Sequence, residues 1–183
     1  MSSDKDKLVR AIAFEYELLS TSYKTFLMTV ELFNKNESCV YEVHIYRSYS
    51  QIIQHLYEFM KAQVAWQYSK TKSEKNEDVK KFIVLSLQKL SKSIPEEIHS
   101  KINFENFADD LRKYRNKVSG HVLKDKFEEY PLDDFYTKNH VYIVWLIQSA
   151  DEWWATDYEQ LTDHPAIKKF ANIFSFKAIN NNS

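Results

Sequence analysis

The sequence predicts an all-α protein, an antiparallel up-and-down bundle of four to five long helices followed by a short C-terminal helix. Three observations predict this fold class. Gly120 is the only glycine in 183 residues, whereas average usage would supply about 13. Pro95, Pro131 and Pro165 are the only prolines, so few positions favour tight turns. Apolar residues recur at spacings of three and four, which is the period of one helical face.

The first two helices are predicted from long apolar lines. The first line consists of Leu8, Ile12, Tyr16, Leu19, Tyr23, Phe26, Val30 and Phe33, and the polar stretch 34–38 ends it. The second helix carries two parallel lines. One consists of Val43, Tyr46, Ser50, Ile53, Tyr57, Met60 and Val64, and the other of Ile45, Ile52, Phe59 and Trp66. Two lines predict a wide buried stripe on this helix.

The remaining helices are shorter. Residues 69–78 are polar and charged without periodicity, which predicts a loop. A third helix has the face Val79, Phe82, Ile83, Leu87 and Leu90, and it ends before Pro95. The fourth follows Phe104, Phe107, Leu111, Tyr114 and Val118, the fifth Tyr142, Leu146, Ala150 and Trp153, and a short sixth Ile167, Phe170 and Phe174. We expect one domain over residues 1–176 and a disordered tail over 177–183.

Composition excludes several classes of function. A formal charge of -1 creates no whole-molecule field that would recruit nucleic acid, so an anion site would need a local cluster. A single cysteine, Cys39, cannot form an internal disulfide, and no apolar run reaches the roughly 18 residues of a membrane span. We therefore expect a cytoplasmic protein without membrane contact. His44 and His55 lie about 16 Å apart along one helix, too far to share a metal ion, so we expect neither metal nor cofactor.

The position of Gly120 predicts where the helix ends within the stretch RKYRNKVSGHVL, residues 112–123. A glycine just beyond the last periodic residue can end a helix in the left-handed conformation. If the chain turns there, His121 leaves the helical phase and can swing towards Arg115. Arginine offers a planar fork of donors that suits phosphate oxygens, and histidine exchanges protons near neutral pH. Because RNA supplies its own 2′-hydroxyl nucleophile, such a pair suits phosphodiester cleavage.

These residues resemble the motif of HEPN domains (higher eukaryotes and prokaryotes nucleotide-binding). That motif is an Arg, four to six further residues and a His, with Asn, Asp or His favoured directly after the Arg. Here Asn116 directly follows Arg115, and five residues, 116–120, separate Arg115 from His121. The resemblance implies a homodimer whose composite site is a metal-independent endoribonuclease, leaving a 2′,3′-cyclic phosphate and a 5′-hydroxyl. It also implies a toxin or abortive-infection role, with an antitoxin or another defence protein as partner.

The sequence departs from the family pattern in one respect. In members neutralised by a nucleotidyltransferase antitoxin, a tyrosine follows the His within a few residues, whereas His121 is followed by Val122, Leu123 and Lys124. This departure puts that particular antitoxin pairing in doubt.

The candidate site residues fall into two groups. Arg115 would bind the scissile phosphate, His121 would move protons, and Asn116 would orient the phosphate or His121. The residues expected to bind RNA are Arg112, Lys113, Lys117, Ser119 and Lys124. Between Asp110 and Lys126 there are six basic residues against two acidic ones, and backbone phosphates favour such a surface.

Two alternatives stay open at this point. The basic residues can simply form a solvated helix face, with Arg115 paired to a carboxylate of a neighbouring helix, Asn116 bonded locally and His121 an ordinary residue after the helix end. The chain would then be a non-catalytic helical module that binds a nucleotide, RNA or protein in a defence or regulatory assembly.

Overall fold

The computed structural model describes residues 4–36, 38–67, 76–92, 103–118, 130–154 and 165–171. This part of the chain contains six α-helices and no strand, which confirms the predicted all-α helical bundle. The helices are α1 (Asp4–Lys35), α2 (Cys39–Gln67), α3 (Asn76–Ser91), α5 (Phe104–Val118), α6 (Leu132–Trp154) and α8 (Pro165–Ala171).

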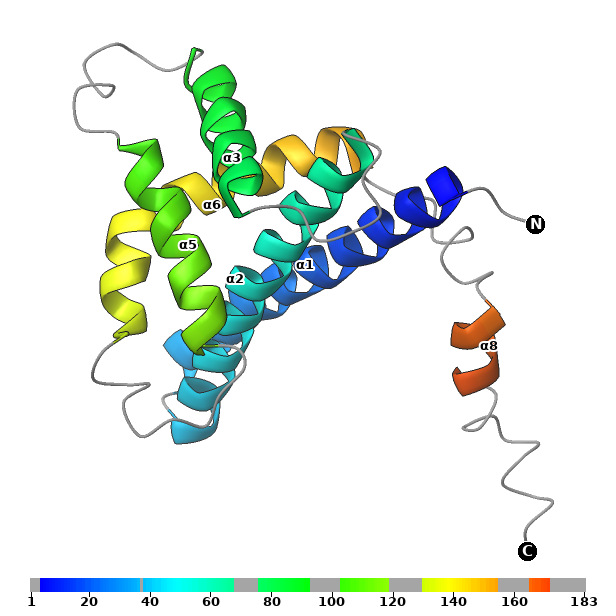
Figure 1. Cartoon of the computed structure of the whole chain (residues 1–183). Helices are drawn as coiled ribbons and strands as arrows, with labels where there is room; N and C mark the ends of the chain where they lie inside the picture. Colours follow the sequence, from blue (N-terminus) through cyan, green and yellow to red (C-terminus); the bar gives the residue numbers. More distant parts are fainter. Residues whose placement is uncertain are drawn as a thin grey trace, which may run out of the picture.

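The two longest helices, α1 and α2, form an antiparallel hairpin and lie side by side for most of their length (Figure 1). The connection is short because polar residues end one helix and begin the next. The backbone N–H of Asn36 donates to the Leu32 carbonyl at 2.9 Å, and the side chain of Ser38 accepts from the Val40 N–H at 3.4 Å. Ser38 thereby caps α2, a role in which serine is strongly preferred.

Helix α2 is the centre of the bundle, since it contacts α1, α3, α5 and α6. Its two apolar lines make this possible, because together they bury more than one side of the helix. The residues Ile52, Ile53, Leu56 and Phe59 are almost completely buried. In Figure 1, α3, α5 and the first half of α6 lie on one side of the α1–α2 hairpin.

The starts of the shorter helices follow from local polar residues. Helix α3 begins at Asn76, so the end of the predicted loop 69–78 is in fact helical. Glu77 and Asp78 lie in its first turn, where the positive end of the helix dipole stabilises carboxylates. At α5, the side chain of Asn103 accepts from the Asn106 N–H at 3.0 Å and caps the helix.

Four residues that the apolar lines predicted to be buried are exposed. Val43 and Trp66 lie near the two ends of α2, and Ile167 and Phe170 lie on α8, which has no buried residue. Figure 1 shows α8 set apart from the bundle. Periodicity identifies the apolar face of a helix, but it carries no information on how far neighbouring helices extend along that face. The predicted tail 177–183 lies outside the described residues.

Candidate functional site

The predicted basic surface occupies the C-terminal half of α5. Arg115 and Lys117 lie in the last turn, while the one acidic residue of the first turn is Glu105. This order of charges matches the helix dipole, which favours cations near the C-terminal carbonyls. Lys113 is exposed, and Arg112 and Lys117 are partly exposed. The arrangement concentrates positive charge where the chain leaves the helix towards residues 119–121.

Among the described residues, three neighbours hold Arg115 in place. Its Nη2 donates to Oε1 of Glu58 on α2, and its Nη1 donates to Oδ1 of Asn116 at 2.8 Å. The guanidinium carbon lies 5.6 Å from the centre of the Tyr57 ring, within cation–π range. The Arg115 side chain remains 35% exposed, and that of Glu58 is 23% exposed. The guanidinium is therefore oriented by the protein and still reachable from solvent.

The residues around this arginine connect three helices. Glu58 also lies 3.7 Å from Nζ of Lys61, one turn further along α2. The Tyr57 hydroxyl donates to the Asn76 side chain at 3.1 Å, which joins α2 to the start of α3. Because Tyr57 is buried in the core, the ring beneath Arg115 has a fixed position. The arginine site is thus built on packed helices.

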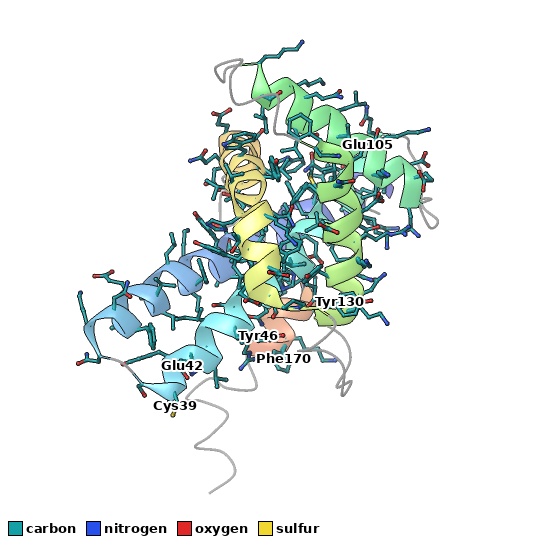
Figure 2. All side chains as sticks on the ribbon, turned by 90° about the vertical axis from the view of Figure 1, so that its left-hand side faces the viewer. Cys39, Glu42, Tyr46, Glu105, Tyr130 and Phe170 are labelled. Atoms are coloured by element: carbon teal, nitrogen blue, oxygen red, sulfur yellow. The ribbon has the colours of Figure 1, made fainter. Side chains whose placement is uncertain are left out.

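Tyr130 lies near the lower end of α5 in Figure 2. Two of the basic residues of α5 lie beside it. Nζ of Lys113 lies 6.0 Å from the centre of its ring, and Nζ of Lys117 lies 5.7 Å from it. The Tyr114 ring meets it edge-on with centres 5.7 Å apart. An aromatic ring with two lysines beside it is a surface suited to a nucleobase and its phosphate.

The hydroxyl of Tyr114 joins α5 to the start of α6. It donates to the Pro131 carbonyl at 3.1 Å, so it is not directed at Arg115. Burial raises the pKa of Tyr114, and the nearby carboxylates of Asp110, Asp134 and Asp133 raise it further. The group therefore stays protonated at neutral pH and acts as a hydrogen-bond donor.

The predicted residues that the structure describes lie on two sides of α5: Arg115 contacts Glu58 and Tyr57 of α2, whereas Lys113 and Lys117 lie beside Tyr130. Arg115 and Asn116 are hydrogen-bonded to each other, and Arg112, Lys113 and Lys117 lie on the same two turns of α5. The contacts of Arg115 and Asn116 also match the alternative reading, a pair with a carboxylate of a neighbouring helix and a local bond. Ser119, Gly120, His121 and Lys124 lie outside the described residues.

Sequence reasoning missed three members of this site, Glu58, Tyr57 and Tyr130. Tyr57 was assigned to the buried face, where it does lie, but its contact with Arg115 was not predicted. A signal for Glu58 existed, because it and Glu42 are the only acidic residues of α2. An acid within an otherwise apolar stretch is expected to have a partner. Its identity depends on tertiary packing, which spacing along the chain does not reveal.

No protein-family model, curated protein or solved structure matches the chain. Among the described residues, no helix is both long and apolar enough to cross a membrane. In the same residues, no group of three potential metal ligands gathers at one place. The HEPN resemblance therefore rests on the motif at Arg115, Asn116 and His121 alone.

Proposed function

We propose that the chain is a metal-independent endoribonuclease of the HEPN type, active as a homodimer at a site formed by the ends of two α5 helices. The supporting observation is that the Arg115 guanidinium is held in place and is also accessible to solvent. Glu58, Asn116 and Tyr57 hold its guanidinium in one orientation, yet about a third of the side chain is exposed. A cation fixed in advance stabilises developing charge at little reorganisation cost, which is the main electrostatic source of catalysis.

In the proposed reaction, the 2′-hydroxyl of one nucleotide attacks the adjacent phosphorus. A histidine removes the hydroxyl proton, and the bond from phosphorus to the 5′ oxygen breaks as that oxygen takes up a proton. Arg115 binds the non-bridging oxygens and stabilises the charge that grows on them. His121 carries the proton transfers, and two copies of the chain supply both a base and an acid. The products are a 2′,3′-cyclic phosphate and a 5′-hydroxyl.

RNA would cross the C-terminal end of α5 to reach Arg115. Arg112, Lys113 and Lys117 would contact backbone phosphates, together with Ser119 and Lys124 from the following segment. Tyr130 lies close to two of these lysines and would stack on a base. Contacts with backbone phosphates would make RNA binding weaker as the salt concentration rises. Stacking on a base would add little sequence preference.

The test is RNA cleavage by the purified full-length chain in the presence of a chelator. We expect cleavage by the unaltered protein, and its loss in both Arg115→Ala and His121→Ala. Arg47→Ala and His44→Ala are matched controls, because both side chains are exposed on α2 outside the site. Cleavage that survives Arg115→Ala and His121→Ala would contradict the assignment. Sedimentation of the protein reports whether a dimer forms, and a strictly monomeric active enzyme would contradict the composite site.

A non-catalytic RNA-, nucleotide- or protein-binding module is the second candidate function. One observation favours it: the bonds of Arg115 to Glu58 and Asn116 provide a structural reason for both residues without any substrate. Under this hypothesis no variant cleaves RNA and the unaltered protein is equally inactive. The cleavage assay therefore separates the two candidates.

A further inference from the structure

A cavity of about 430 Å³ lies between the second half of α1 and the first turns of α2 and α6. This is the size range of small-molecule sites. Its aromatic walls are Phe26 from α1, Tyr46 and Tyr49 from α2, and Tyr136 from α6. Figure 2 shows Tyr46 on α2 close to the start of α6, with Glu42 one turn earlier. Along α2, Tyr49 and Glu58 are about 14 Å apart, so the cavity is separate from the Arg115 site.

The aromatic rings of this cavity are inclined to one another. The centres of Phe26 and Tyr49 are 5.1 Å apart with planes at 49°, and those of Tyr49 and Tyr136 are 5.2 Å apart at 60°. At these distances the rings pack directly against one another. Tyr136 is 42% exposed, whereas Tyr49 and Phe26 are buried. The face of an aromatic ring carries partial negative charge, so the exposed part of Tyr136 can attract a cation.

The charged residues that line the cavity are both acidic. They are Glu42 and Asp133, and no basic residue of the described chain lines it. Neither carboxylate forms an ion pair with another described residue, whereas the adjacent Asp134 lies 3.8 Å from Nζ of Lys138. The combination of apolar aromatic walls and two carboxylates complements a positively charged ligand.

The titratable groups behind these walls add no positive charge at neutral pH. His140 stacks on Tyr136 with ring centres 4.4 Å apart, and its Nδ1 lies 3.2 Å from the Tyr49 hydroxyl. Burial lowers the pKa of His140, so the imidazole stays neutral. Burial also raises the pKa of Tyr46 and that of Tyr49, so both phenols stay protonated.

We propose that this cavity binds a small organic cation whose nitrogen carries alkyl groups, such as a quaternary ammonium compound. An ammonium with N–H groups would lose hydrogen bonds to water against these apolar walls, whereas a fully alkylated nitrogen has no N–H to satisfy. The alkyl groups contact Tyr136, the most exposed ring of the wall, and Glu42 and Asp133 balance the charge. This assignment is independent of the ribonuclease proposal.

The two carboxylates also have a simpler explanation, which the test must separate. Glu42 lies in the first turn of α2, and Asp133 and Asp134 lie in the first turn of α6, where acids stabilise the helix dipole. Asp133 and Asp134 share this helix position, but only Asp133 lines the cavity. Asp133→Asn and Asp134→Asn are therefore a matched pair of variants.

The experiment is an NMR amide-shift titration of the full chain with choline and with neohexyl alcohol, the neutral carbon isostere of choline. We expect saturable shifts at the cavity residues and roughly tenfold tighter binding of choline. Asp133→Asn should weaken choline binding roughly threefold, and Asp134→Asn should leave it unchanged. Tyr136→Leu should weaken it, and Tyr136→Phe, which keeps the ring, should retain it.

Three results would overturn the proposal. Equal affinity for the two probes would identify an apolar cavity without selectivity for charge. Equal effects of Asp133→Asn and Asp134→Asn would assign the carboxylates to the helix end alone. Shifts confined to other surfaces would place cation binding elsewhere. Circular dichroism of Tyr136→Leu shows whether that variant folds, and the aspartate pair decides the question if it does not.

Discussion

Arg115 illustrates how one residue combines a structural and a chemical role. Its pair with Glu58 joins α5 to α2, and each side chain is partly exposed, at 35% and 23%. Exposed pairs contribute little to stability because water screens them, whereas breaking a buried pair is costly. The Arg115–Glu58 pair is partly exposed, and Arg115 also has a hydrogen bond to Asn116 and an aromatic ring below it. We therefore expect its contribution to the free energy of unfolding to lie between these two limits.

Glu58→Gln tests the strength of this pair. The amide keeps the shape of the side chain and removes the charge, so we expect a loss of about 1 kcal/mol in the free energy of unfolding. The measurement is urea unfolding, compared with Arg115→Ala and the double variant in a thermodynamic cycle. Glu31→Gln is the matched control, because its pair with Lys35 is well exposed on both sides. Equal losses for Glu58→Gln and Glu31→Gln would show that the Arg115 pair adds nothing.

At this scale the sequence predicted residue types better than contacts. The residue order around Arg115 predicted an anion site, and the structure places Arg112, Lys113 and Lys117 around the same end of α5. It did not predict Glu58, which is 57 positions away in the chain. Nor did it predict the contacts of Tyr130 with Lys113 and Lys117. Contacts of this kind depend on how helices pack, and no local pattern encodes them.

At the scale of the helix, periodicity predicted the core of α2 well and its ends poorly. Ile53, Tyr57, Met60 and Val64 are all buried, as the first apolar line predicted. Val43, on the same line, is exposed. The middle of α2 contacts helices on several sides, whereas a residue near a helix end is buried only if a neighbour extends that far. Helix lengths and crossing points set this limit, and they are properties of the assembled bundle.

Leu56→Ala tests the central position of α2. Leu56 is fully buried at the middle of the helix, so removing its side chain leaves a cavity among several helices. We expect a loss of about 2–5 kcal/mol in the free energy of unfolding. Leu85→Ala is the control, since Leu85 is exposed on α3 and the same change should cost no more than about 0.5 kcal/mol. Similar losses in the two variants would contradict the placement of Leu56 in the core.

At the scale of the whole molecule, the core contains an unusual share of tyrosine. The pKa is raised, with burial as the largest cause, at Tyr16, Tyr23, Tyr46, Tyr49, Tyr114 and Tyr142. These residues belong to α1, α2, α5 and α6. For Tyr16, burial and then the hydrogen bond to Asp151 of α6 raise the pKa to about 12. The fold therefore holds these phenols in the neutral form.

The consequence is a specific loss of stability in alkali. A group whose folded pKa lies above its unfolded pKa contributes its full stabilisation below the unfolded value, here 10.0, and loses it as the pH rises through the folded value. The free energy of unfolding should therefore fall steeply between about pH 10 and 12, because the unfolded chain releases phenolic protons more readily. Urea unfolding at several pH values measures this slope directly.

Tyr16→Phe should reduce that slope, because it removes one of the groups responsible. It should also lower stability at neutral pH by about 1 kcal/mol, since Asp151 loses its donor. Tyr41→Phe is the control, because Tyr41 lies at the start of α2 outside the hydrophobic core, and its slope should equal that of the unaltered protein. Tyrosinate absorbance that develops below pH 10 while the helical signal stays intact would contradict this view. The buried phenols would then ionise within the folded bundle, and packing around Tyr16 and Tyr49 would not be what holds their protons.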